Sequence, residues 1–297
     1  MRPLVVGTYP PRLCGIATFT ADVVDAMAAL PDVKRPAVAA VTRCDEPRLP
    51  HAVSSDIGAV IEQENWAGYR AAATVANTFD VVLIEHAFGI FGGPDGEMLL
   101  GFVDGLDVPF VVSLHTVLPS PTANQKRVLR RLCERAAAVM VFTATARRIL
   151  LDQGVARAGK VRIVPHGAPS ELFERRDADD AKSVFGVSGR PVVSTFGLLS
   201  SGKGIEVGLR AVDSVRDVVP DVVYIVAGQT HPGVLRVEGE RYREELLRLV
   251  DALDLADNVR FVDRFMDVDD LAQLLSATDV FCTPYHNGDQ IVSGALT

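Results

Sequence analysis

Short runs of apolar, mostly β-branched residues alternate along the whole sequence with segments of helical periodicity. A strand buried on both faces requires such a continuous run, whereas a helix on a sheet requires apolar residues three and four positions apart. The runs predict strands at Leu4–Gly7, Val38–Val41, Asp80–Ile84, Pro109–Leu114, Val139–Phe142, Val161–Val164, Val192–Phe196, Val222–Ala227, Val259–Val262 and Val280–Thr283. The periodic segments predict helices at Thr18–Leu30, Glu64–Ala76, Glu97–Val103, Asn124–Ala136, Glu238–Leu253 and Asp267–Ser276. This alternation predicts an α/β fold of parallel sheets flanked by helices.

The predicted elements fall into two groups. With 297 residues, of which 48% are hydrophobic, the chain is long enough for two cores. Residues 171–190 are charged and lack a strand pattern, so we expect them to connect a first domain, residues 1–170, to a second, residues 191–297. Residues 43–58, with two prolines, are predicted as loop. Because open α/β sheets bind ligands beyond the carboxyl ends of their strands, two such domains predict a ligand cleft between them.

Composition argues against several classes of function. The formal charge is −8 and no dense run of Lys and Arg is present, which argues against a nucleic-acid partner. The four cysteines lack metal-ligand spacing, which indicates free thiols in a reducing compartment. No stretch approaches the roughly 18 apolar residues of a membrane span, and the N-terminus lacks a long apolar segment. These features predict a soluble, cytoplasmic protein without a transmembrane segment.

The segment Ser194–Glu206, STFGLLSSGKGIE, has the composition of an anion site. A β-branched run ends at Gly197, small residues follow, and a helical pattern begins after Gly204 and continues to about Val218. The free N–H groups of the helix, its dipole and the charge of Lys203 would together favour a phosphate or diphosphate. A solvated lysine in an ordinary strand-to-helix turn is the alternative interpretation. The segment matches neither the NTPase phosphate loop nor G-x-G-x-x-G.

Seven segments together resemble the GT-B glycosyltransferases, in particular the retaining family 4 group. They are TYPPRLCGIATFT, SLHTVL, VRIVPHGAP, STFGLLSSGKGIE, YIVAGQ, NVRFVDRFMDVDDLAQLLSATDVFCTPY and NGDQIVSG. They span nearly the whole chain, and their order is more specific than any single segment. The resemblance implies two Rossmann-like domains facing a cleft, with the acceptor bound by the first and a nucleotide diphosphate sugar by the second. It implies transfer of a hexose, mannose or glucose, from a UDP or GDP donor to a hydroxyl with retention, as in carbohydrate biosynthesis, with no metal or other cofactor.

The resemblance also implies roles for individual residues. Lys203 matches the lysine that neutralises the donor diphosphate, with the backbone of Gly197 and Gly204 nearby. A fixed cation there would help catalysis, because the negative charge of the leaving diphosphate grows in the transition state. Gly15 matches a glycine-rich first loop near the phosphates or the acceptor, and a simple turn is its alternative. His115 matches a histidine that meets the donor sugar near the reaction centre, and a loop histidine bonded to backbone is its alternative.

The sequence departs from the family pattern at four positions. An arginine that usually follows the phosphate-strand glycine is Leu198 here. Two family glutamates, one for the sugar and one for the ribose, fall on Asp289 and Thr297. Asp289 keeps a carboxylate and is expected, with neighbouring Gln290, to bind the sugar, whereas Thr297 cannot hold a ribose in the same way. Asp263 replaces a glycine near the base, so base preference stays open.

Two other histidines and the end of the sequence bear on function. His166 is interpreted as a structural residue on the hinge side, and His86, beside Glu85, as either an acceptor-side residue or a chance placement. The sequence ends at Thr297, with about four strands in the second domain, which we therefore expect to be incomplete. Missing strands would expose a sheet edge, so weak or absent activity, or a homodimer that covers the edge, is expected.

Two alternative functions stay open at this point. One is a non-catalytic module that binds a sugar nucleotide or a glycan, and the other is a GT-B-type sugar-nucleotide epimerase. Donor hydrolysis in the absence of acceptor distinguishes them. A transferase releases nucleotide diphosphate, a binding module only shifts its melting temperature, and an epimerase returns an intact nucleotide sugar with altered stereochemistry.

Overall fold

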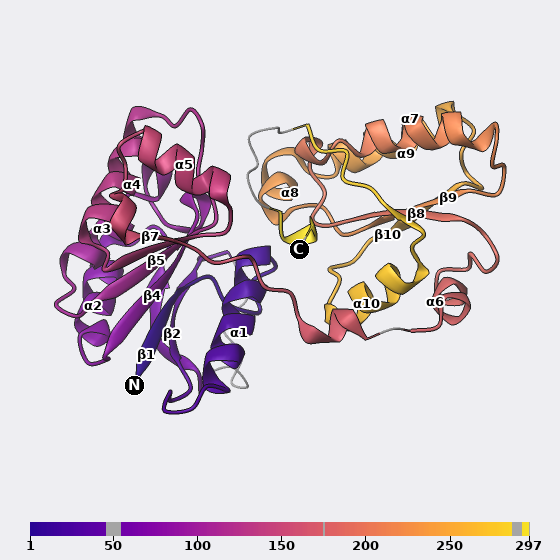
Figure 1. The fold of residues 1–297 in the computed structure, drawn as a ribbon. Helices are drawn as coiled ribbons and strands as arrows, with labels where there is room; N and C mark the ends of the chain where they lie inside the picture. Colours follow the sequence, from indigo (N-terminus) through magenta and orange to yellow (C-terminus); the bar gives the residue numbers. More distant parts are fainter. Residues whose placement is uncertain (46–54, 175, 287–292, 297) are drawn as a thin grey trace. The chain divides into compact units, whose positions relative to one another are not determined.

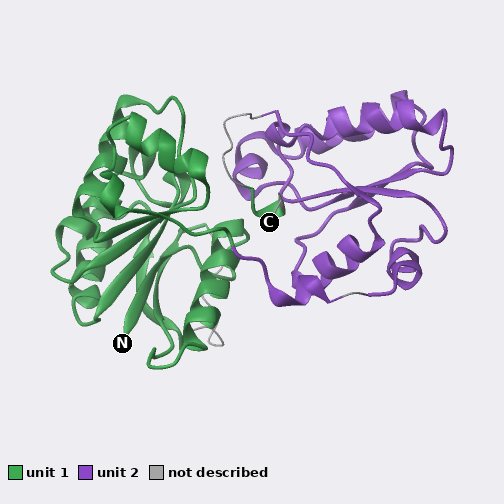
Figure 2. Ribbon diagram, viewed as in Figure 1, with its two compact units in different colours: residues 1–166, 289–296 green, residues 167–288, 297 purple. Residues whose placement is uncertain are grey.

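A computed structural model describes residues 1–45, 55–174, 176–286 and 293–296. The chain divides into two compact units, which Figure 2 shows in separate colours. Unit 1 comprises residues 1–166 together with 293–296, and unit 2 comprises residues 167–286 of the described chain. Each unit has its own parallel sheet and its own hydrophobic core (Figure 1).

Unit 1 is built on a seven-stranded parallel sheet with strand order β3-β2-β1-β4-β5-β6-β7. Its strands are β1 (Pro3–Gly7), β2 (Ala37–Thr42), β3 (Ile57–Glu62), β4 (Val81–His86), β5 (Phe110–Leu114), β6 (Ala138–Val141) and β7 (Val161–Ile163). Its α-helices are α1 (Gly15–Ala28), α2 (Trp66–Ala76), α3 (Leu99–Asp104), α4 (Ala123–Arg135) and α5 (Ala144–Asp152). Helix α1 packs on one face of the sheet through Val24, and the apolar faces of α2 to α5 bury the other. The strands at the centre are therefore covered on both faces.

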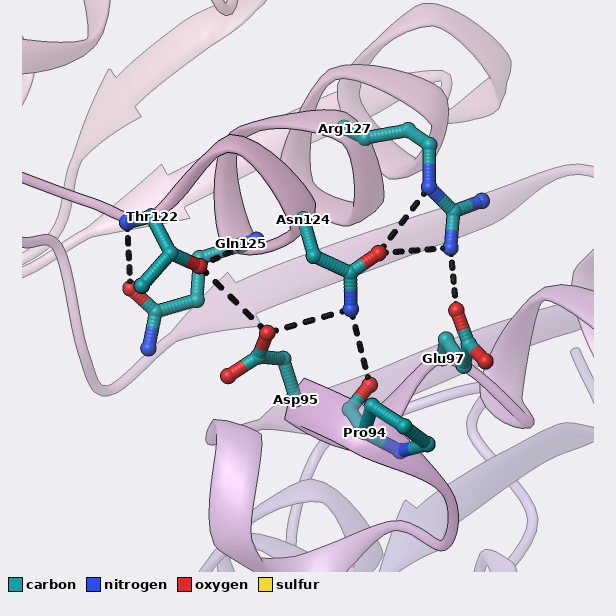
Figure 3. Close-up of polar contacts among 7 residues, drawn as sticks. All are labelled: Pro94, Asp95, Glu97, Thr122, Asn124, Gln125 and Arg127. Atoms are coloured by element: carbon teal, nitrogen blue, oxygen red, sulfur yellow. Dashed lines mark hydrogen bonds and ion pairs between the residues drawn. The ribbon is translucent and has the colours of Figure 1, made fainter.

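Local sequence determines where α4 begins. Thr122 and Gln125 form a capping box, in which each side chain hydrogen-bonds the backbone N–H of the other residue. Figure 3 shows how this end of the helix is tied to the preceding 3-10 turn η3 (Pro94–Gly96). Asn124 donates to the carbonyl oxygen of Pro94 at 3.1 Å, and Arg127 forms an ion pair with Glu97. These contacts hold a strongly basic helix against the acidic turn.

Unit 2 contains a four-stranded parallel sheet with strand order β10-β9-β8-β11. Its strands are β8 (Val192–Phe196), β9 (Val223–Ala227), β10 (Val259–Val262) and β11 (Val280–Phe281). Its α-helices are α6 (Ala178–Val184), α7 (Ile205–Arg216), α8 (Pro232–Glu238), α9 (Arg241–Ala252) and α10 (Val268–Ala277). Helices α7 and α9 bury one face of the sheet, and α10, with α6 packed against it, lies on the other (Figure 1).

The predicted α/β class with parallel sheets is confirmed, and the structure adds to or shifts the local predictions in three places. Strand β3 extends over Ile57–Glu62, where loop was predicted up to residue 58. This edge strand is half exposed, so it lacks a continuous apolar run. Residues 171–190, expected as a connection, contain α6, whose single buried residue is Ala181. The helix predicted from Glu238 is divided at Gly239, whose φ of +64° ends α8 before α9 begins.

The loops that follow β8 and β9 approach each other at two glycines. Gly228 has φ +139°, and a Cβ added there would lie 2.1 Å from the carbonyl oxygen of Gly197. Gly197 itself has φ +132° and donates its N–H to the carbonyl oxygen of Ala227 at 2.9 Å. The approach therefore requires glycine at position 228 for both steric and backbone reasons.

We predict that Gly228→Ala lowers the free energy of unfolding by at least about 2 kcal/mol, because it combines an unfavourable φ with a backbone collision. Gly186→Ala is the matched control: its φ is also positive, but no atom lies within 4 Å of the added Cβ. We expect a cost of about 1 kcal/mol there. Urea denaturation of both variants measures the difference, and equal losses would contradict the prediction.

Candidate functional site

The loop between β8 and α7 brings three predicted site residues together. The chain leaves β8 at Gly197, passes through the 3-10 turn η6 (Ser201–Lys203), and enters α7 through Gly204, which has φ +61°. Leu199 anchors the middle of the loop, because its N–H donates to the carbonyl oxygen of Gln229 and its own carbonyl accepts from the N–H of His231. A Cβ at Gly204 would lie 2.0 Å from the carbonyl oxygen of Pro284, so a second segment packs directly on this turn.

The side chain of Lys203 folds back across the loop. Its Nζ donates a hydrogen bond to the hydroxyl of Tyr285 at 3.0 Å and lies 4.1 Å from the centre of that ring. A Cβ added at Gly197 would lie 3.5 Å from the same nitrogen. The structure thus places a partly buried ammonium group beside the glycine that ends β8. A cation held against exposed backbone in this way can bind a phosphate oxygen.

The first turn of α7 differs from the expected row of free N–H groups. The N–H of Ile205 donates to the hydroxyl of Tyr242 at 3.1 Å, and that hydroxyl donates to Glu206 at 2.6 Å. The other carboxylate oxygen of Glu206 lies 2.6 Å from Nε2 of His286. Partial burial raises the pKa of Glu206, but the hydrogen bonds from His286 and Tyr242 outweigh it, so that the pKa lies below its usual value. Anion binding here therefore depends more on Lys203 than on the helix end.

A buried arginine supports the neighbouring loops of unit 2. Arg243 is 8% exposed and donates to the carbonyl oxygen of Gly228 at 3.0 Å. Its guanidinium also pairs with Asp263 at 2.6 Å and with Glu240 at 3.3 Å. Asp263, one of the four departures from the family pattern, thus has a structural partner. Sequence reasoning missed Arg243, because within an amphipathic helix it is indistinguishable from a solvent-exposed charge.

In unit 1, the carboxyl ends of β4 and β5 carry a histidine–carboxylate pair. Nε2 of His115 lies 2.7 Å from Oε2 of Glu85, whose side chain is only 1% exposed. Phe19 and Phe142 flank the imidazole, with ring centres 4.8 and 5.0 Å away. The ring therefore bonds to a carboxylate and not, as the alternative interpretation had it, to backbone. Glu85 was missed as its partner, although both residues stand at the ends of neighbouring strands.

Of the remaining candidate residues, two are described by the structure and two are not. Gly15 is exposed and opens α1, where no atom lies within 4 Å of an added Cβ. His166 packs on the same Phe19 and Phe142 rings that flank His115, at 4.8 and 5.0 Å. Asp289 and Gln290, expected to bind the sugar, lie outside the described residues. The structure thus gathers His115 and His166 around Phe19, which lies one helical turn after Gly15.

His86 belongs to the core of unit 1. It is fully buried, with its ring centre 5.2 Å from that of Phe88 and 6.0 Å from that of Phe91. Within the described chain, neither ring nitrogen has a hydrogen-bond partner. Burial, and to a smaller extent the neighbouring His115, lowers the pKa of His86 to about 3. The His86 ring is therefore neutral at ordinary pH.

The described residues contain no group of three or more His, Cys, Asp and Glu side chains placed to hold a metal ion. They also contain no helix with the length and apolar character needed to span a membrane.

Comparisons with known proteins identify two families and one fold. The family described as Glycosyltransferase Family 4 matches residues 15–172, and the family described as Glycosyl transferases group 1 matches residues 177–290. A comparison with curated protein sequences finds no match.

Solved structures resemble the chain over most of its length. HepE from Anabaena, in complex with UDP and glucose, has a TM-score of 0.74 at 17% identity, covering 98% of this chain and 76% of that one. The same protein in complex with UDP-glucose has a TM-score of 0.72 at 17% identity, covering 97% and 75%. A UDP-forming α,α-trehalose-phosphate synthase from Burkholderia xenovorans has a TM-score of 0.60 at 14% identity, covering 94% and 77%. These likenesses show the fold, and the expected GT-B class with two Rossmann-like sheets is confirmed.

We predict that His86 makes stability depend on pH. Between the ordinary histidine pKa of about 6.5 and the folded value of about 3, the unfolded chain binds more protons, so stability falls as the pH is lowered through this interval. The loss attributable to His86 approaches about 1.4 kcal/mol per pH unit. Urea denaturation from pH 8 to 4 should show a shallower decline for His86→Leu than for the wild type. Parallel curves would contradict the prediction.

Proposed function

The chain belongs to Glycosyltransferase Family 4, and on this basis we propose that it transfers a hexose from a nucleotide diphosphate sugar to an acceptor hydroxyl with retention. The observation that carries the proposal is the ammonium of Lys203, held between Gly197 and Tyr285 at the carboxyl end of β8. Ligands of open α/β sheets bind at this end of the strands. The complexes of HepE with UDP and UDP-glucose support a UDP donor, with glucose as the first sugar to test.

Lys203 would act on the leaving group. When the bond between the anomeric carbon and the diphosphate breaks, negative charge builds on the phosphate oxygens. A cation that is already in place stabilises this charge more in the transition state than in the bound donor, and so raises the rate. In a retaining front-face reaction, a leaving phosphate oxygen would also take the proton of the acceptor hydroxyl. Such a reaction needs no carboxylate nucleophile from the protein.

His115 would contact the transferred sugar. Its Nε2–H donates to the carboxylate of Glu85, which fixes the ring and leaves Nδ1 to face other partners. In the neutral form of the ring, Nδ1 can accept a hydrogen bond from a sugar hydroxyl. Asp289 and Gln290 are proposed as further sugar ligands on the basis of the family pattern. The acceptor is assigned to unit 1 by the same resemblance.

A non-catalytic binding module is the second candidate, and the loop between β8 and α7 itself favours it. Leu198 stands where relatives carry a cation, and the carboxylate of Glu206 lies in the first turn of α7. Both features reduce the positive charge available to stabilise a leaving diphosphate. Ground-state binding could persist under these conditions while catalysis is weak.

Incubation with UDP-glucose or GDP-mannose in the absence of acceptor tests the proposed function. A transferase releases free UDP or GDP, because water slowly replaces the acceptor. A nucleotide sugar that raises the melting temperature of the protein but releases no UDP or GDP would instead assign the chain as a binding module. This result must hold both with and without sugar and alcohol acceptors. An intact nucleotide sugar with altered stereochemistry would assign it as an epimerase.

We predict that Lys203→Ala weakens UDP binding about tenfold to 150-fold, since a charged hydrogen bond to phosphate contributes about 1.5–3 kcal/mol. Isothermal titration calorimetry measures the dissociation constant. Lys34→Ala, which removes the same charge from an exposed position in unit 1, is the matched control and should leave it unchanged. Equal affinities of the Lys203 and Lys34 variants would exclude Lys203 from the site.

A further inference from the structure

The position of the Lys203 ammonium depends on a residue far away in the sequence. A lysine side chain has four rotatable bonds, and holding it in one arrangement costs conformational entropy. Here the hydroxyl of Tyr285 accepts a hydrogen bond from Nζ, and the face of the same ring attracts the cation at 4.1 Å. Tyr285 therefore supplies two contacts that both favour the arrangement in which the ammonium lies beside Gly197.

Tyr285 is itself fixed by contacts that do not involve Lys203. The segment Pro284–His286 follows β11, and three contacts hold it over the loop. The carbonyl oxygen of Pro284 packs where Gly204 lacks a Cβ, the N–H of His286 donates to the carbonyl oxygen of Gly202 at 3.1 Å, and the His286 ring pairs with Glu206. Removing the Lys203 side chain would leave these contacts intact.

The hydrogen-bonding capacity of the two groups suits a diphosphate. An ammonium group has three N–H donors, and Tyr285 accepts only one of them, which leaves two for phosphate oxygens. Tyr285 thus engages one N–H of the ammonium and leaves the other two for a ligand.

We propose that Tyr285 is a positioning residue for the donor diphosphate, which holds Lys203 in its binding arrangement; this inference rests on the proposed function. The proposal makes Tyr285 and Lys203 energetically coupled. Tyr285 contributes to diphosphate affinity mainly through the lysine, so its contribution largely disappears when the lysine is removed. A merely structural tyrosine would weaken binding to the same degree in both backgrounds.

A double-mutant cycle tests this coupling. UDP and inorganic pyrophosphate are titrated into the wild type, Lys203→Ala, Tyr285→Phe, Tyr285→Leu and the two double variants. In the wild-type background we expect Tyr285→Phe to weaken UDP binding about threefold to tenfold, and Tyr285→Leu about tenfold to 30-fold. In the Lys203→Ala background we expect each change to be at most about twofold. Tyr9→Phe in unit 1 is the matched control for loss of a tyrosine hydroxyl and should leave affinity unchanged.

A ligand-free measurement separates this inference from the proposed function. Nuclear magnetic resonance of Lys203 should show its ε-methylene protons shifted upfield by the Tyr285 ring, and the shift should disappear in Tyr285→Leu. Absence of the shift in the wild type, or Tyr285 effects that multiply with that of Lys203→Ala, would overturn the positioning role. A third outcome is that the shift is present and Tyr285 is coupled to Lys203 in pyrophosphate binding, while UDP-glucose is neither bound nor hydrolysed. In that case the proposed function is wrong, and the positioning role holds for diphosphate alone. Failure to bind either ligand would overturn both.

Discussion

The position of Lys203, the proposed diphosphate ligand, depends on polypeptide backbone that passes closer to its loop than any side chain would permit. Gly197 and Gly228 bring the ends of β8 and β9 together, and Gly204 lets the carbonyl of Pro284 lie against the start of α7. The absence of Cβ atoms at these places does more than relieve collisions. It brings the segments that follow β8 and β11 to one ammonium group, and it packs the segment that follows β9 against the first of them.

Both units bury charged side chains near the carboxyl ends of their strands. Glu85 in unit 1 is almost completely inaccessible and bonds to His115, while Arg243 in unit 2 is shared between a backbone carbonyl and two carboxylates. An isolated charge in either place would cost several kcal/mol of desolvation, so each is retained only with its partners. Each charged group lies at or supports a loop that follows the carboxyl end of a strand. The energetic cost of burying charge is thus concentrated where ligands of such folds bind.

Sequence reasoning predicted those elements whose residue pattern is compatible with only one kind of secondary structure. Strands β1, β4 and β9 are buried on both faces, so their apolar runs were unambiguous, whereas half-exposed β3 was not predicted as a strand. Lys203 and His115 were identified from local motifs. Their partners were not, because Tyr285 follows Lys203 by 82 positions and Glu85 precedes His115 by 30, separations that only the strand order makes close. His86 shows the converse, since a histidine at a strand end is equally compatible with a ligand contact and with the core.

The charges in the loop between β8 and α7 make the position of Lys203 important for the proposed function. The segment from Gly197 to Gly204 contains one basic residue, Lys203, and Glu206 places a carboxylate just beyond it. In a loop with two cations, one poorly placed side chain would still leave a positive charge near the diphosphate. For the proposed reaction the ammonium must already be in position, since any reorganisation at the moment of bond cleavage would subtract directly from transition-state stabilisation. The aromatic ring of Tyr285 achieves this placement without introducing a carboxylate that would neutralise the charge, and so preserves for the ligand the one cation that the loop supplies.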